Sequence, residues 1–157
     1  LIEGSPKNAR LLMRPHVRRN STKLPLAVCP EGQKYVQIKS SGAVSADVEL
    51  ASDGFMEQWH KGDRVNNIVN VSCKPFGKML RSAGLADGID IASVDAEGAE
   101  LRVLETMDWS IPVRVWMIEL DDSDKTRDES IRALLKAKGY CQAPTDRKFL
   151  RQYCGDG

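Results

Sequence analysis

Acidic residues lie at the ends of three of the strands that the sequence predicts. Glu3 follows a short apolar stretch, Asp95 ends the apolar run 89–95, and Glu119 ends the apolar run 113–119. In open α/β sheets, ligands bind outside the carboxyl ends of the strands. A carboxylate beside a buried sheet is costly unless it is paired or binds something. We therefore expect the three acids to meet at one edge of the sheet and to line one crevice.

The first of these acids, Glu3, has two interpretations. Its two carboxylate oxygens could accept hydrogen bonds from both hydroxyl groups of a ribose, as an acid does at the end of the second strand in dinucleotide-binding folds. An acid in this place can also simply stabilise the N-terminus of the following helix through the helix dipole. Spacing alone leaves both interpretations open.

The densest group of acids lies in the segment 95–101, Asp-Ala-Glu-Gly-Ala-Glu-Leu. Gly98 allows close approach of the backbone, and a helix that starts here offers free N–H groups. Asp95 and Glu97 are therefore candidate catalytic residues that would orient a substrate hydroxyl or act as a general base, and Glu97 could instead face the ammonium group of a cofactor. The alternative is that Asp95 caps the helix while Glu97 and Glu100 complement its dipole.

Glu119 is the third candidate catalytic residue. Together with Asp95 it could hold Mg²⁺, an ion that needs few protein ligands because it keeps several waters. We predict no metal site and keep this pair as the alternative. A further alternative is that the two acids only flank the loop and cap the next helix.

The elements that would position these acids alternate between strands and helices. Apolar runs predict strands, and apolar residues at helical spacing between Pro and Gly breaks predict helices. The predicted strands cover 1–2, 24–29, 35–38, 65–73, 89–95, 113–119, 139–141 and 148–153, and the predicted helices cover 6–13 (with Ser5 as its cap), 76–83, 99–107 and 128–138. This order predicts an α/β fold: a mostly parallel sheet with helices on both faces and a C-terminal antiparallel hairpin.

Residues 40–63 form an excursion that is rich in Ser, Gly and Asp and lacks a regular apolar pattern. Long loops of this kind often serve function. Phe55, Met56 and Trp59 are candidate residues of an acceptor pocket there, whereas we expect His60 to be a surface histidine rather than a base. Trp109 and Trp116 are expected to be packing residues.

Composition places the chain among ordinary globular domains. Its 157 residues suffice for one domain, and 23 Lys and Arg residues balance 22 Asp and Glu residues. The chain therefore has no overall field to attract nucleic acid or an anionic membrane, and we predict no nucleic-acid partner. The local basic cluster at 14–23 is expected to be solvated, with phosphate or acidic substrate as the alternative contact. No apolar run approaches the roughly 20 residues that cross a bilayer.

The four cysteines lie far apart in the sequence, at positions 29, 73, 141 and 154. Their spacing is wrong for a structural zinc site, so we expect buried free thiols, with a disulfide between Cys141 and Cys154 as the alternative for a secretory protein. The chain opens Leu-Ile-Glu-Gly, without Met or a signal pattern. We therefore expect a piece of a longer protein, cytoplasmic by default, with an upstream targeting segment as the open alternative.

Several of these segments resemble the FkbM family of methyltransferases. The strand and turn at 89–101, with Asp-x-Glu-Gly-x-Glu followed by a Leu-rich helix and Asp108-Trp109, resemble the signature of that family. Leu1-Ile2-Glu3-Gly4-Ser5-Pro6 looks like its second strand, and Ile118-Glu119 and Gly139-Tyr140 fall where the family has its fifth strand and its Gly-Tyr pair. The likeness covers nearly the whole chain in the right order.

The resemblance implies a Rossmann-like domain that uses S-adenosylmethionine as its cofactor. In this family the methyl group usually passes to a hydroxyl oxygen of a sugar or natural product, so the expected partner is a small-molecule or glycan acceptor. Glu3 and Gly4 would bind the ribose side of the cofactor, and Val28 and Cys29 would lie near its adenine. Asp95, Glu97 and Glu119 would face the methyl group and the acceptor, with Asp95 also touching the cofactor.

One departure from the family pattern matters. The Gly-rich first strand and loop have no counterpart here, so residues 1–157 would be a single but partial domain whose missing strand is central. Unpaired strand edges are a liability, and we therefore predict that these residues alone bind the cofactor weakly or not at all. The alternatives are a nucleotide-linked oxidoreductase, for which Glu3 is also suited, and a non-catalytic Rossmann-like binding module.

Overall fold

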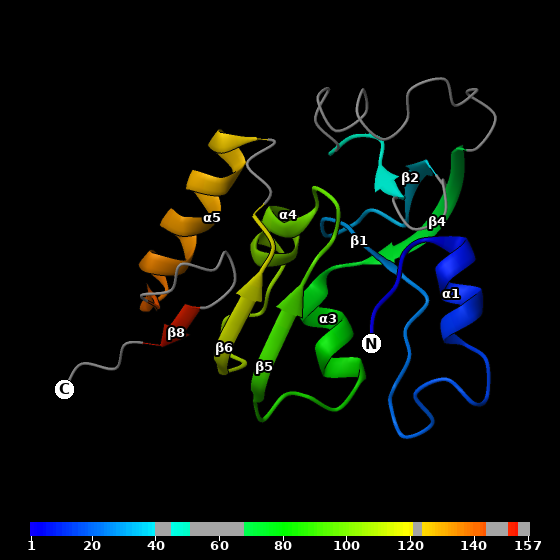
Figure 1. Ribbon diagram of the computed structural model, residues 1–157, viewed down its shortest axis with the longest axis horizontal. Coiled ribbons are helices and arrows are strands. Elements are labelled where there is room, and N and C mark those ends of the chain that lie inside the picture. The colour runs from blue at the N-terminus through cyan, green and yellow to red at the C-terminus, as the bar shows by residue number, and fades with distance from the viewer. Residues whose placement is uncertain (40–44, 51–67, 121–123, 144–150, 154–157) are drawn as a thin grey trace.

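The computed structural model describes residues 1–39, 45–50, 68–120, 124–143 and 151–153, and these form a mixed α/β fold (Figure 1). Its helices are α1 (Pro6–Leu12), α3 (Phe76–Ser82), α4 (Glu100–Glu105) and α5 (Lys125–Ala137). Its strands are β1 (Ala27–Val28), β2 (Tyr35–Lys39), β3 (Ala46–Asp47), β4 (Ile68–Lys74), β5 (Ile89–Val94), β6 (Val113–Ile118), β7 (Tyr140–Gln142) and β8 (Arg151–Tyr153). The predicted order of strands and helices is confirmed for these segments.

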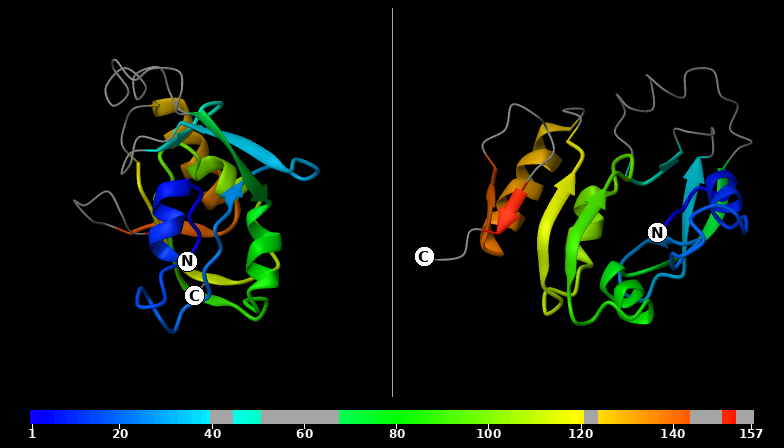
Figure 2. Two further views of the ribbon diagram at one scale, coloured as in Figure 1. Left: turned by 90° about the vertical axis from the view of Figure 1, so that its right-hand side faces the viewer. Right: turned by 60° about the horizontal axis from the view of Figure 1, so that its bottom comes forward.

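The strands form two four-stranded sheets rather than one. The first has the order β1-β4-β2-β3, with β1 parallel to β4, and with β2 antiparallel to β4 and β3. The second has the order β5-β6-β8-β7, with β5 parallel to β6, and with β8 antiparallel to β6 and β7 (Figure 2). The α/β class and the terminal antiparallel hairpin are thus confirmed, whereas the mostly parallel single sheet is confirmed only in part.

The two sheets do not join, because the N-terminal segment and β5 each have an edge without a partner strand among the described residues. The N-terminal segment pairs with Leu24 alone: Leu24 N–H donates to the Leu1 carbonyl at 2.8 Å, and Glu3 N–H donates to the Leu24 carbonyl at 3.1 Å. The edge of β5 opposite β6 is likewise unpaired. Ile91 on β5 is 65% exposed and Leu1 is 54% exposed. Apolar strand edges without a partner are a liability for folding and solubility.

The main core lies around β6 and is centred on Trp116, which is fully buried. The Trp116 ring lies 6.4 Å from that of Phe76 in α3 and 5.9 Å from that of Trp109, measured between ring centroids. Tilted aromatic pairs at such distances add to the stabilisation from burial alone. Trp109 and Trp116 are therefore packing residues, as predicted. The other large side chains with no exposed area in this core are Met79, Leu104, Ile131 and Leu135.

Helix ends differ from prediction by a few residues, for reasons visible in the caps. Helix α5 begins three residues before the expected Asp128, because the Asp124 carboxylate accepts the N–H of Arg127 and caps the helix there. Ser5 precedes α1, but its hydroxyl makes no cap hydrogen bond. The Ser5 hydroxyl instead donates to Ser45 Oγ at 3.1 Å. Ser5 is thus the N-cap residue and Pro6 the first residue of α1, as predicted, but the Ser5 side chain does not make the capping hydrogen bond.

Part of the predicted excursion has regular structure. β3 pairs antiparallel with β2, with Ala46 opposite Lys39 and Asp47 opposite Ile38. Residues 40–44 and 51–63 of the excursion lie outside the described residues, and these include the candidate pocket residues Phe55, Met56 and Trp59 and the histidine His60. No helix in the described part of the chain has the length and apolarity needed to cross a membrane.

A second, smaller core between β1, β2 and β4 contains a disulfide between Cys29 and Cys73. The parallel register places Ala27 opposite Cys73, which brings Cys29 beside its partner. Cys141 is also disulfide-bonded. The expectation of free thiols is therefore wrong for these three cysteines. Cys154, the other half of the predicted pair with Cys141, lies outside the described residues.

Candidate functional site

A cavity of about 630 Å³ lies between the N-terminal segment, β1 and β5, and it follows β5 from Ile89 to Asp95 along the edge that has no partner strand among the described residues. Glu3, Gly4, Val28, Asp95 and Glu97 all line it. Its volume falls in the range of small-molecule and cofactor sites. The structure thus brings together five of the predicted site residues. A smaller hollow of about 440 Å³, between the loop at Pro30 and the end of α4, contains none of them.

Glu3 is held at the cavity by the start of α1. Its Oε1 accepts a hydrogen bond from the backbone N–H of Ser5 at 2.7 Å. Within the described residues, Oε2 has no hydrogen-bond or ion-pair partner. One oxygen of Glu3 thus stabilises the helix start, as one interpretation expected, and the binding of a ribose by the other stays a prediction.

Gly4 and Val28 form the neighbouring wall. A Cβ atom on Gly4 would lie 3.1 Å from Ala27 Cβ and 3.3 Å from Ile38 Cδ1, so a side chain here would push against β1 and β2. Gly4 therefore has a packing requirement that is independent of any ligand. Val28, at the end of β1, contributes apolar surface together with Leu26.

Cys29, the other residue expected near an adenine, does not line the cavity. It is completely buried and bonded to Cys73. Its side chain points into the second core because residues along a strand alternate between the two faces of the sheet. Cys29 is therefore a structural cross-link directly after Val28, and the predicted position of this turn near an adenine stays a prediction.

Asp95 and Glu97 belong to the turn between β5 and α4. Glu97 has φ +49 and Gly98 has φ +103. A left-handed backbone is uncommon for a residue other than glycine, and strain of this kind concentrates at functional sites. Both residues of the turn line the cavity.

Glu119 lies beside Asp95 rather than in the cavity lining. β5 and β6 are paired to their ends, and Glu119 N–H donates to the Val94 carbonyl at 3.0 Å. A hydrogen bond with Asp95, followed by burial and the charges of Asp95, Glu97 and Glu100, raises the pKa of Glu119 to about 7. Two carboxyl groups in contact favour retention of one proton between them.

Asp47 is a residue of this site that the sequence did not reveal. It lines the cavity from β3, and burial raises the pKa of its carboxyl group above the usual value. Its Oδ1 accepts the N–H of Glu49 at 3.0 Å. Asp47 lies in a stretch without apolar alternation, so no signal in the sequence pointed to it. In the described part of the chain, no group of three or more His, Cys, Asp or Glu residues is arranged to hold a metal ion.

Together, these observations describe a mixed α/β domain with a cavity along β5 that Glu3, Asp95 and Glu97 line. The family model of the methyltransferase FkbM domain matches residues 1–141. The chain therefore belongs to the FkbM methyltransferase family, as its sequence motifs indicated, and this membership supports methyltransferase activity. No curated protein and no solved structure matches the chain.

Proposed function

We propose that this chain is the part of an S-adenosylmethionine-dependent methyltransferase that acts on a hydroxyl group of a sugar or small natural product. Family membership supports methyl transfer as the reaction. The observation that carries the proposal is the single cavity that joins Glu3 to Asp95 and Glu97. These residues come from two segments about ninety positions apart, and the fold brings them to one place.

The cavity suits the proposed cofactor in size and in the chemistry of its walls. Glu3 offers the free Oε2 as an acceptor for a ribose hydroxyl, and Leu26 and Val28 offer apolar surface for an adenine. Ligand pockets combine a mostly apolar lining with a few placed polar groups. Glu97 would bind the ammonium group of the cofactor or a hydroxyl of the acceptor.

When bound, the cofactor would supply an electrophilic methyl group on sulfur, and the acceptor oxygen would displace that sulfur as its leaving group. Asp95 would accept the proton of the acceptor hydroxyl as the new carbon–oxygen bond forms. Glu119 would act through Asp95, because its own carboxyl group lies behind the cavity wall. Positioning of the two reactants would provide much of the remaining acceleration.

Binding of S-adenosylhomocysteine to the full-length protein tests the cofactor half of the proposal. Calorimetry should give a micromolar Kd for the wild type. Glu3→Gln should weaken binding about tenfold or more, because a charged hydrogen bond contributes about 1.5–3 kcal/mol. Glu31→Gln is the matched control, since Glu31 is exposed and does not line this cavity. Equal affinity in the wild type and Glu3→Gln would contradict the ribose assignment.

Transfer is tested with S-adenosylmethionine carrying a tritiated methyl group and a panel of monosaccharides, glycans and small alcohols. Label that appears in a hydroxyl position supports O-methylation. Tight cofactor binding without transfer to any acceptor would favour the non-catalytic binding module instead.

The rate of methyl transfer should depend on pH, because Glu119 titrates in contact with Asp95. Below about pH 7 Glu119 keeps its proton and donates a hydrogen bond to Asp95. This hydrogen bond would make the Asp95 carboxylate a weaker base toward the acceptor hydroxyl. We therefore expect the rate at saturating substrates to rise with pH through about 7 and to level off above it. Glu119→Gln should remove this titration. A wild-type profile that is flat between pH 6 and 8 would contradict the role of the pair.

A further inference from the structure

Glu100, the first residue of α4, is buried more deeply than the acids that line the cavity. It is 3% exposed, and it does not belong to the cavity lining. Burial of a carboxylate is costly unless backbone donors or a cation compensate its charge. An acid that only complemented a helix dipole would remain in solvent, so the contacts of Glu100 require another explanation.

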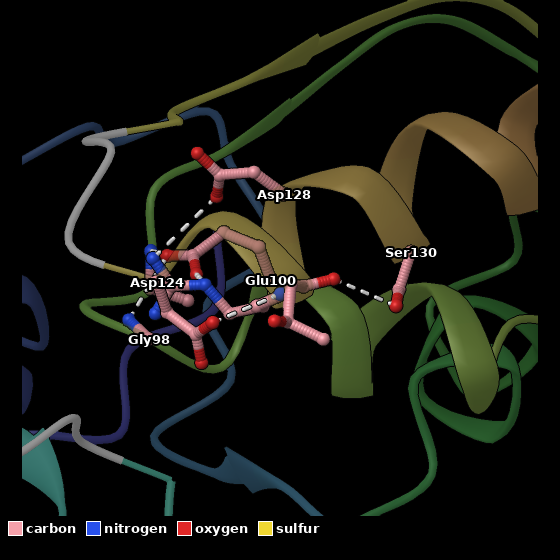
Figure 3. Close-up of polar contacts among 8 residues, drawn as sticks. Gly98, Glu100, Asp124, Asp128 and Ser130 are labelled. Atoms are coloured by element: carbon pink, nitrogen blue, oxygen red, sulfur yellow. Dashed lines mark hydrogen bonds and ion pairs between the residues drawn. The ribbon is translucent and has the colours of Figure 1, made fainter.

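One oxygen of Glu100 holds the turn that carries Asp95 and Glu97. Oε1 accepts hydrogen bonds from the N–H groups of Ala96, at 2.9 Å, and Gly98, at 3.2 Å (Figure 3). These two N–H groups flank Glu97, whose backbone is left-handed at φ +49. A strained conformation of this kind persists only where its surroundings enforce it. The two hydrogen bonds to Glu100 Oε1 hold the backbone of Glu97 in this conformation from inside the turn.

The other oxygen of Glu100 faces a cation on α5. Arg127 Nε lies 3.9 Å from Glu100 Oε2, and the two side chains are 9% and 3% exposed. Asp128 Oδ1 lies 3.7 Å from Arg127 Nη2. Figure 3 shows Glu100 directed at Gly98, with Asp124 and Asp128 at the start of α5 beside it. Arg127 thus lies between two buried carboxylates, and it offsets part of the charge of Glu100 across 3.9 Å without a hydrogen bond to Glu100 Oε2.

We propose that Glu100 is a positioning residue, which fixes the 95–98 turn so that Asp95 and Glu97 face the cavity, and which Arg127 anchors to α5. The inference rests on the proposed function, because that function gives Asp95 and Glu97 their task. Glu100 itself would touch neither the cofactor nor the acceptor, because it does not line the cavity. Its effect on the positions of Asp95 and Glu97 passes through the backbone of Ala96 and Gly98.

The first test measures the turn directly and needs no substrate. In the full-length protein, Glu100→Ala should accelerate hydrogen exchange at the Ala96 and Gly98 amides by about tenfold or more, because local opening frees both N–H groups. The matched control is Glu105→Ala on the same helix, where the side chain is 52% exposed and pairs with Arg102 at 3.4 Å. The control should leave exchange in the turn unchanged. Unchanged exchange in Glu100→Ala would overturn the inference.

The second test separates positioning from general stability. Transfer from tritiated S-adenosylmethionine is measured with the best acceptor of the panel. We expect kcat to fall by about 100-fold in Glu100→Ala, as for a small misplacement of reacting groups. The KM for the acceptor and the Kd for S-adenosylhomocysteine should change by less than about threefold, because Glu100 does not line the cavity. Glu105→Ala should keep the wild-type kcat.

Glu100→Gln provides a variant that keeps an acceptor oxygen for the two N–H groups and removes only the charge. It should retain more activity than Glu100→Ala. The hydrogen bond with Asp95, burial, and the charges of Asp95, Glu97 and finally Glu100 raise the pKa of Glu119. Removal of the Glu100 charge should therefore shift the pH profile to a midpoint slightly below that of the wild type. A purely structural role would lower thermal stability without moving this midpoint.

These experiments test the proposed methyl transfer and the positioning role of Glu100 separately. If the wild type neither binds S-adenosylhomocysteine nor transfers a methyl group, the proposed function fails, and the inference fails with it. If the wild type is active and Glu100→Ala keeps its kcat within about twofold although the turn exchanges faster, only the positioning role is overturned. If Glu100→Ala does not fold, the inference is tested with Glu100→Gln instead. A Glu100→Gln variant with the kcat and the pH midpoint of the wild type would overturn the inference.

Discussion

Replacement of Asp95 by asparagine is expected to reduce the rate of methyl transfer by about 10²–10⁴-fold, the range attributed to a general base. Asparagine keeps the shape of the side chain and can still accept a hydrogen bond from Glu119, but it cannot take the proton of the acceptor. The loss should appear in kcat at saturating S-adenosylmethionine and acceptor. A transfer assay with the tritiated cofactor measures it.

The control for this substitution lies on the same strand. Asp90→Asn makes the same chemical change on β5, where the Asp90 side chain is 84% exposed and pairs with Arg114 at 3.3 Å. It should leave the rate unchanged, because surface ion pairs of this kind contribute little. In Asp95→Asn, the pKa of Glu119 itself should fall, since the hydrogen bond then goes to a neutral acceptor and the charge of Asp95, which also raises this pKa, is lost. Full activity in Asp95→Asn would refute the assignment of the base.

The sequence predicted the parts of the site that depend on strand order. Asp95 and Glu119 each end an apolar run, and parallel pairing of β5 with β6 necessarily brings the ends of these runs together. Glu3 could be placed by the same argument, because Leu1 and Ile2 read as the end of a strand. These predictions depend only on the period and length of apolar runs, which are the most reliable signals in a sequence.

The sequence did not distinguish the task of Glu100 from that of Glu97. Both acids fall at the start of one helix, where the dipole favours any carboxylate. Which of them turns inward depends on the left-handed backbone of Glu97 and on Arg127, which is 27 positions further along the chain. Asp47 was missed for a similar reason, because only the pairing of β3 with β2 brings it to the cavity.

Loss of the disulfide between Cys29 and Cys73 is expected to lower the free energy of unfolding by about 4 kcal/mol. The bond closes a loop of 44 residues, and the chain-entropy relation gives about this value for such a loop. Denaturant unfolding of Cys29→Ala, Cys73→Ala and the double variant measures it. Each single substitution already removes the whole cross-link, so the double variant should lose no more than about 0.5 kcal/mol beyond either single one.

Chemical reduction gives an independent control. A reducing agent should lower the melting temperature of the wild type towards that of the double variant, and should have a smaller effect on the double variant, which retains only the bond at Cys141. Alkylation of Cys29 or Cys73 in the native, unreduced protein would contradict the cross-link. Because disulfides persist in oxidising compartments, the bond favours such a compartment over the cytoplasmic default. It also has a consequence for the cavity: Val28, which lines it, immediately precedes Cys29, so the cross-link fixes the wall proposed to hold the adenine.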